Sequence, residues 1–315
     1  MFRTTGHVER FFFYQPRNGL TRAYPVLFGS VPEGIFTEES DIDVIIVFVH
    51  VVSYGKTRAK ADVMNPHLSE EVGRKTLRRL YSYLQDRINR YVKELSSGPY
   101  FNQILHANVP ILKSYPLFRE KFKCDTDITV TYDGVFSTLW CILHMYRDNS
   151  KRRALDVKSI WLRIKQKLLN GRLTDVTSGG LSKYGYQVMM FNFLVEEHWL
   201  PKVNPTLVQR WASNDLPEAL VSRQIPIYTV EDQRKLYSDA AAKIYSRCAA
   251  EDDNYQIKNV EDVTNLENRI LLYFTDELGM TNFTLCDPIN RKLSLLKKNF
   301  DRKRAFTILS QYKNN

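Results

Sequence analysis

The sequence predicts a two-domain protein, in which an α/β domain is followed by a mainly helical domain. Its 315 residues are enough for two hydrophobic cores of ordinary size. The extended apolar runs that are typical of buried strands occupy residues 44–49, 109–113 and 127–131. From about Val135 onward, apolar residues recur at helical spacing instead. We therefore expect the α/β domain over residues 1–134 and the helical domain over residues 135–315.

A helical insertion is expected within the first domain, over about residues 65–97. Between Leu68 and Leu95 the apolar residues follow a period of 3.6, and arginines lie off this stripe. The basic face of this amphipathic helix is interpreted as a solvated surface. The polar stretch before it, residues 53–64, is expected to be a loop.

Two aspartates precede the first predicted strand, in the order Ser40-Asp41-Ile42-Asp43. Side chains two positions apart on a strand point to the same face, so Asp41 and Asp43 project together. Two carboxylates at the start of a buried strand repel each other unless a cation neutralises them. A hard divalent ion such as Mg2+ prefers oxygen ligands of this kind. An isolated Asp-x-Asp would indicate a solvated loop. Directly before a buried strand, the same pattern predicts a metal site.

A Gly-Ser pair lies shortly before these aspartates. Gly29 allows the backbone to approach a phosphate closely. Ser30 and the amide groups that follow it are suited to hold that phosphate by hydrogen bonds at a helix N-terminus. Together with the aspartates, the pair predicts a site for a nucleotide and a metal ion.

These motifs resemble those of the DNA polymerase β-like nucleotidyltransferase superfamily. The residues that carry the resemblance are Gly29, Ser30, Gly34, Ile35, Ser40, Asp41 and Asp43. Further along the chain, it narrows to the terminal uridylyltransferases and the non-canonical poly(A) polymerases. The resemblance implies a palm domain with a mixed sheet, a helical nucleotide-recognition domain, a cleft between the two, and two Mg2+ ions, for which Mn2+ is the alternative.

The family places a third aspartate on a later strand, where it acts as a general base toward the attacking hydroxyl. Asp127 fits this position best, because an alternating apolar pattern follows it. Asp125 lies two residues earlier on the same face, so both assignments stay open. By the resemblance, Asp41, Asp43 and the third aspartate bind the two ions and activate the nucleophile. The asparagine that usually contacts the ribose in the family is replaced here by residues 131–134, Thr-Tyr-Asp-Gly.

The helical domain contains further residues for which the resemblance implies nucleotide binding. Gly180-Leu181-Ser182-Lys183-Tyr184 is similar to the family's Gly-Leu-Ser-Ser-Tyr signature, which implies that Ser182 contacts the triphosphate and that Tyr184 stacks on the base. Asp287 belongs to a segment that resembles the family's Asp-Pro element, which implies that it lies near the base and helps to read it. The candidates for the family's cationic pair on the triphosphate are Lys158, Arg163 and Lys165.

The composition fits a polyanionic partner and gives no sign of a membrane span. Lys and Arg total 45 against 35 Asp and Glu, a formal charge of +10, which suits RNA. No apolar stretch is long enough to cross a bilayer. The four cysteines lack metal or disulfide spacing, which indicates a reducing compartment. Mitochondrial and cytoplasmic locations both stay open.

Taken together, the resemblance implies template-independent addition of nucleotides to an RNA 3′ end. We favour UTP over ATP. The compact chain shows no recognisable appended RNA-binding domain, as in the small uridylyltransferases of RNA processing. RNA specificity is then expected to come from protein partners. The alternatives are a poly(A) polymerase that uses ATP and a catalytically silent relative that serves as an RNA-binding or scaffold subunit.

Overall fold

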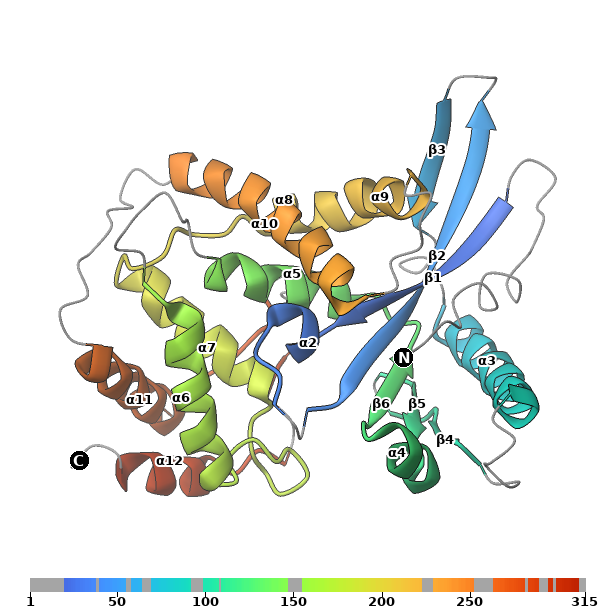
Figure 1. Cartoon of the computed structure of the whole chain (residues 1–315). Coiled ribbons are helices and arrows are strands. Elements are labelled where there is room, and N and C mark those ends of the chain that lie inside the picture. Colours follow the sequence, from blue (N-terminus) through green and yellow to red (C-terminus); the bar gives the residue numbers. More distant parts are fainter. Residues whose placement is uncertain are drawn as a thin grey trace. The chain divides into compact units, whose positions relative to one another are not determined.

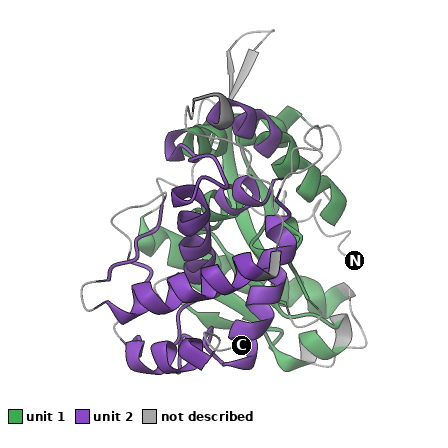
Figure 2. Cartoon of the chain, turned by 90° about the vertical axis from the view of Figure 1, so that its left-hand side faces the viewer, with its two compact units in different colours: residues 1–139, 207–240 green, residues 140–206, 241–315 purple. Residues whose placement is uncertain are grey.

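Figure 1 shows the helices and strands of the computed structural model, which divides into two compact units (Figure 2). It describes residues 20–37, 40–54, 58–63, 69–91, 99–107, 109–146, 155–222, 229–251, 263–280, 283–288, 294–296 and 299–311. The first unit consists of Met1–Leu139 and Leu207–Ala240, and the second of Trp140–Thr206 and Ala241–Asn315. The division falls within three helices, α5 (Asp133–Met145), α8 (Pro205–Arg210) and α10 (Val230–Glu251).

The first unit is built on a mixed six-stranded sheet with the order β1-β2-β6-β5-β4, and β3 also pairs with β2. The strands are β1 (Leu20–Phe28), β2 (Ile42–Tyr54), β3 (Arg58–Val63), β4 (Phe101–Ile104), β5 (Ile111–Ser114) and β6 (Thr126–Thr129). The central strand β2 is antiparallel to β1 and β3 and parallel to β6. β5 is antiparallel to both of its neighbours. This topology places β2 and β6 side by side, with their first residues at the same end.

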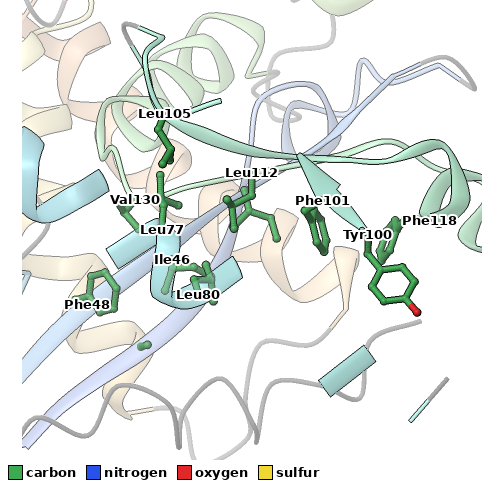
Figure 3. Close-up of a cluster of buried hydrophobic side chains, with 12 residues drawn as sticks. Ile46, Phe48, Leu77, Leu80, Tyr100, Phe101, Leu105, Leu112, Phe118 and Val130 are labelled. Atoms are coloured by element: carbon green, nitrogen blue, oxygen red, sulfur yellow. The ribbon is translucent and has the colours of Figure 1, made fainter. Parts of the chain in front are cut away.

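One face of the sheet packs against α3 (Glu70–Tyr91). Alternate residues of β2, including Ile46 and Phe48, meet Leu77 and Leu80 of α3 in a buried cluster (Figure 3). The period of two in the strand and the period of 3.6 in the helix bring these apolar faces together. The residues between them in β2, beginning with Asp43, therefore point to the opposite face.

The helices that complete the first unit are short, apart from those shared with the second. They are α2 (Ser30–Glu33), α4 (Pro116–Phe122), α8 (Pro205–Arg210), the π-helix η2 (Trp211–Asp215) and α9 (Leu216–Ser222). The predicted loop over residues 53–64 is wrong, because β2 continues to Tyr54 and β3 pairs with it in a hairpin. The long helix of the first domain is α3, and its flanking residues 64–68 and 92–98 lie outside the described part of the chain.

The second unit is helical. It contains α6 (Val157–Asn170), α7 (Lys183–Glu196), α11 (Val263–Gly279), α12 (Arg302–Ser310) and the later parts of α5 and α10. α11 packs against α6, α7 and α12. Among the described helices, none combines the length and the apolar character that crossing a bilayer requires.

The division into units differs from a single boundary at residue 134, because Leu207–Ala240 return to the first unit. Side chains from the start of α10 hydrogen-bond to the backbone of β1 and α2, as described below. These bonds join segments about 200 residues apart, which no local pattern in the sequence reveals.

Candidate functional site

The aspartates predicted from the sequence meet where β2 and β6 begin. In the parallel pairing of these strands, Asp43 lies directly beside Asp127. Asp41 comes two residues before Asp43, just ahead of β2. Neighbouring side chains of paired strands lie on the same face, so Asp43 and Asp127 share the face opposite the α3 core.

Asp125 has a different environment from Asp127. Its Oδ2 lies 3.3 Å from Nη1 of Arg119, and its Oδ1 accepts a hydrogen bond from Ser114 Oγ at 3.4 Å. Its backbone carbonyl accepts from the N–H of Ile42 at 2.8 Å, which starts the β2–β6 pairing. Asp125 thus anchors the strand end, whereas Asp127 lies beside Asp43.

Among the three predicted aspartates that form ion pairs, Asp41, Asp125 and Asp127, the side chain of Asp127 is the most buried. Its side chain is 17% exposed, against 41% for Asp41. Burial raises the pKa of Asp127 above its usual range, the positive charge of Lys113 lowers it, and the negative charges of Asp41 and Asp125 raise it further. Its buried Oδ1 has no hydrogen-bond partner among the described residues.

Lys113 is the basic residue of this carboxylate group, and the sequence reasoning did not single it out. Its Nζ lies 3.7 Å from Oδ1 of Asp127 and 3.9 Å from Oδ2 of Asp41. In the antiparallel pairing of β5 and β6, Lys113 lies opposite Asp127. The signal in the sequence was its position in the strand, since Lys113 follows the fully buried Leu112 and so points to the other face.

The Gly-Ser loop lies against the same group. Gly29 has φ +72° and ψ −146°, a conformation that is essentially confined to glycine. A Cβ atom on Gly29 would lie 2.6 Å from Oδ2 of Asp43. The Gly29 N–H donates to Oγ1 of the fully buried Thr138, in α5, at 2.7 Å. Ser30 begins α2, and its half-buried hydroxyl makes no hydrogen bond with the residues that the structure describes.

Three side chains near the start of α10 hold the segment that carries this loop. Gln233 Oε1 accepts from the N–H of Leu27 at 3.2 Å, and Tyr237 donates its hydroxyl to the Leu27 carbonyl at 3.0 Å. Arg234 Nε donates to the carbonyl of Val31, in α2, at 3.0 Å. We refer to Gln233, Arg234 and Tyr237 as the α10 clamp. Sequence reasoning missed it because the partners are more than 200 residues apart.

In the second unit, two of the predicted nucleotide-binding residues meet. Tyr184 donates its hydroxyl to Oδ2 of the buried Asp287 at 2.9 Å. Ser182 is the N-cap of α7, and its Oγ accepts from the N–H of Gly185 at 3.1 Å. The Ser-x-Tyr signature is thus the first turn of a helix, a structure typical of an N-cap serine.

The three cationic candidates on α6 do not share one environment. Arg163 forms an ion pair with the buried carboxylate of Glu267, which Lys167 also approaches at 3.8 Å. Lys165 is only 3% exposed, whereas Lys158 is half-buried in the first turn of the helix. The charge of Arg163 is therefore balanced within the second unit.

The carboxylate group has the chemistry to hold a divalent cation, although it is not closed around one. Among the described residues, no three Asp, Glu, His or Cys side chains converge closely enough to bind a metal ion as they stand. Asp41, Asp43 and Asp127 nevertheless offer only hard oxygen donors, and one buried oxygen of Asp127 has no hydrogen-bond partner. The ammonium of Lys113 lies beside two of these carboxylates, where positive charge is favoured. These carboxylates are therefore suited to serve as ligands of Mg2+ or Mn2+.

Residues 19–96 match the family model described as a nucleotidyltransferase domain. This part of the chain is similar to a nucleotidyltransferase domain. The matched range includes the Gly-Ser loop, Asp41 and Asp43, and it ends before Asp127. The superfamily predicted from the sequence is thereby confirmed. The search of curated proteins gave no match.

The fold of this chain is similar to that of a solved terminal uridylyl transferase. Terminal uridylyl transferase 4 from Trypanosoma brucei, solved with bound CTP, aligns with a TM-score of 0.50 and 16% identity over 93% of this chain and 86% of that one. Cid1, in complex with the UTP analog UMPNPP, gives a TM-score of 0.49 and 13% identity over 99% and 83% of the two chains. At such identity the first match shows the fold, and it confirms the predicted α/β plus helical class.

Proposed function

We propose that this chain is an RNA 3′-terminal uridylyltransferase, which adds UMP from UTP to an RNA 3′-hydroxyl without a template. The observation that carries the proposal is the pairing of Asp43 with Asp127 in neighbouring strands. Asp43 also follows Asp41 by two residues, and its carboxylate lies against Gly29. This arrangement joins the three carboxylates of a two-metal site to a loop that is shaped to approach phosphate.

In this proposal, Asp127 accepts the proton of the attacking hydroxyl. Its carboxylate lies beside Asp43 in the paired strands, at the place where the proposal puts the attacking hydroxyl. Asp41 and Asp43, together with Asp127, would hold two Mg2+ ions, for which Mn2+ could substitute. When bound, such ions neutralise the triphosphate and lower the pKa of the hydroxyl.

The remaining predicted residues are proposed to bind the nucleotide. Gly29 and Ser30 receive the phosphates, since the glycine conformation leaves the backbone open and the serine hydroxyl has no hydrogen bond to a described residue. Tyr184 stacks on the base, and its hydrogen bond to Asp287 fixes the orientation of the ring. Ser182, Lys158 and Lys165 are proposed to contact the triphosphate; for Arg163 the ion pair with Glu267 makes this role less favourable.

The choice of RNA and of UTP has separate support. The net charge of +10 suits a polyanionic acceptor. UTP is favoured because the solved protein whose fold this chain shares is a terminal uridylyl transferase. We propose that protein partners add RNA specificity.

Primer extension tests the proposal. A labelled single-stranded RNA with a free 3′-hydroxyl is incubated with Mg2+ and each triphosphate separately, using the intact chain and the Asp127→Asn and Asp125→Asn variants. We expect extension with UTP, loss of activity by at least 100-fold in Asp127→Asn, and a much smaller effect in Asp125→Asn. Preference for ATP would indicate a poly(A) polymerase. No extension across several RNAs, even with the partner-containing complex, would contradict the enzyme assignment and favour the scaffold.

A further inference from the structure

Lys113 takes up a position that the proposed reaction does not explain. Its ammonium is the common partner of two carboxylates, at 3.7 Å from Asp127 Oδ1 and 3.9 Å from Asp41 Oδ2. Both distances exceed a hydrogen bond, so the contact is electrostatic. A cation shared between two carboxylates is the arrangement that a metal ion itself would have.

The sheet fixes where Lys113 points. Leu112, the residue before it, is fully buried in the α3 core, and β5 pairs with strands on both sides. In these pairings, Lys113 lies between Asn102 of β4 and Asp127 of β6. The neighbouring strands therefore hold the base of this side chain beside the carboxylates, although its ammonium end is partly exposed.

We propose that Lys113 is a positioning residue that serves as an internal counter-ion for the metal-free carboxylate group and competes with the metal ion for it. This inference rests on the proposed function, because it concerns the same carboxylates. Asp41 and Asp127 repel each other, and Asp127 is largely withdrawn from water. The ammonium lowers this repulsion, so that the carboxylates stay together before a divalent ion binds.

An ordinary surface ion pair would not have this effect. Exposed pairs contribute little, because water screens them and two long side chains must be ordered. Here one ammonium acts on two carboxylates, and one of these is 17% exposed. A divalent ion that enters the group brings two positive charges close to the ammonium, so binding must overcome their repulsion or displace the lysine side chain.

The test is the affinity for Mn2+ in the absence of nucleotide and RNA, measured from the signal of free Mn2+ in electron paramagnetic resonance. Lys113→Met keeps the length of the side chain and removes its charge, whereas Lys113→Arg keeps the charge. Lys75→Met is the matched control, because Lys75 forms an exposed ion pair with Glu71 on α3, its sole ion pair among the described residues, and its loss changes the net charge equally.

We expect Lys113→Met to bind Mn2+ roughly ten-fold more tightly than the unmodified chain, the scale of Coulomb repulsion between nearby charges in water. Lys113→Arg and Lys75→Met should bind as the unmodified chain does. Without metal, Lys113→Met should also melt at a lower temperature, and Mn2+ should raise its melting temperature by more.

Unchanged or weaker Mn2+ binding by Lys113→Met would overturn the inference, because a structural or triphosphate-binding lysine predicts no gain in metal affinity. Equal tightening in Lys75→Met would overturn it as well, since the effect would then come from net charge. The proposed function fails in a different way. In that case Asp43→Asn would leave Mn2+ binding intact, or RNA extension would be absent while Lys113→Met still binds Mn2+ more tightly.

Discussion

Replacing Gly29 by alanine perturbs the point where the Gly-Ser loop meets the Asp43 carboxylate. The new methyl group would lie 2.6 Å from Oδ2 of Asp43, and ordinary contacts begin at 3.4 Å. At the same time, φ of +72° with ψ of −146° is a conformation that side-chain-bearing residues rarely adopt. The substitution is therefore unfavourable for two independent reasons.

The size of each effect follows from the geometry. Backbone strain of this kind costs about 1–3 kcal/mol, which should appear in the free energy of unfolding. To restore ordinary contact, the Asp43 carboxylate or the Gly29 backbone must move by almost 1 Å. Displacements of about 1 Å in a catalytic group commonly cost about 100-fold in rate. We thus expect Gly29→Ala to lower kcat for RNA extension by about 100-fold.

The assay pairs urea denaturation with RNA extension, carried out well below the melting temperature of the variant. Gly73→Ala is the matched control. Gly73 lies in α3, and a Cβ atom there would be 3.5 Å from Cγ2 of Val130, which is ordinary contact. Alanine in a helix interior is favoured over glycine by about 1 kcal/mol, so this control should be neutral or more stable.

Two results would refute the reasoning. If Gly29→Ala unfolds at the same urea concentration as the unmodified chain, the backbone conformation is not restricted to glycine. If it is destabilised but extends RNA within a few-fold of the unmodified rate, the contact between the loop and Asp43 does not matter to the chemistry.

Two further predictions concern buried groups. Tyr237→Phe removes the donor to the Leu27 carbonyl, so the free energy of unfolding should fall by about 1–2 kcal/mol in urea denaturation; an unchanged midpoint would mean that the α10 clamp does not hold β1. Burial lowers the pKa of His144 from 6.5 to about 4. Between pH 4 and pH 6.5, His144 binds a proton in the unfolded chain but not in the folded one. The contribution of His144 to the free energy of unfolding is therefore fully present above pH 6.5 and is lost as the pH falls toward 4. Between pH 7 and pH 5, the free energy of unfolding of His144→Phe should therefore fall by about 2 kcal/mol less than that of the unmodified chain. If urea denaturation shows the same decrease for both proteins, His144 is not buried as a neutral imidazole.

The sequence was sufficient where the structure depends on neighbouring residues. Asp41 and Asp43 could be placed on one face because a strand follows them directly, and Gly29 could be recognised because its role is conformational. The pairing of Asp43 with Asp127 needed the sheet register, which also separated Asp127 from Asp125. Until β2 and β6 are placed side by side, both aspartates fit the pattern equally well.

The contacts that escaped prediction are all non-local. β3 carries a polar sequence and is a strand because it pairs with the end of β2, so its own residues predicted a loop. Arg163 looked available for a triphosphate, but Glu267 neutralises it from a helix more than 100 residues away. The α10 clamp depends on residues that approach each other only after the chain has folded.

The return of Leu207–Ala240 to the first unit has a consequence for the order in which the protein matures. During synthesis, the strands of the sheet emerge long before Gln233 and Tyr237, which bond to the backbone of β1. Until then, part of the β1 edge has no such partners, and open strand edges invite association with other chains. The chain must therefore be translated beyond Tyr237 before the first unit is complete, and a polypeptide released before that point would retain the aspartates but leave this part of the β1 edge open.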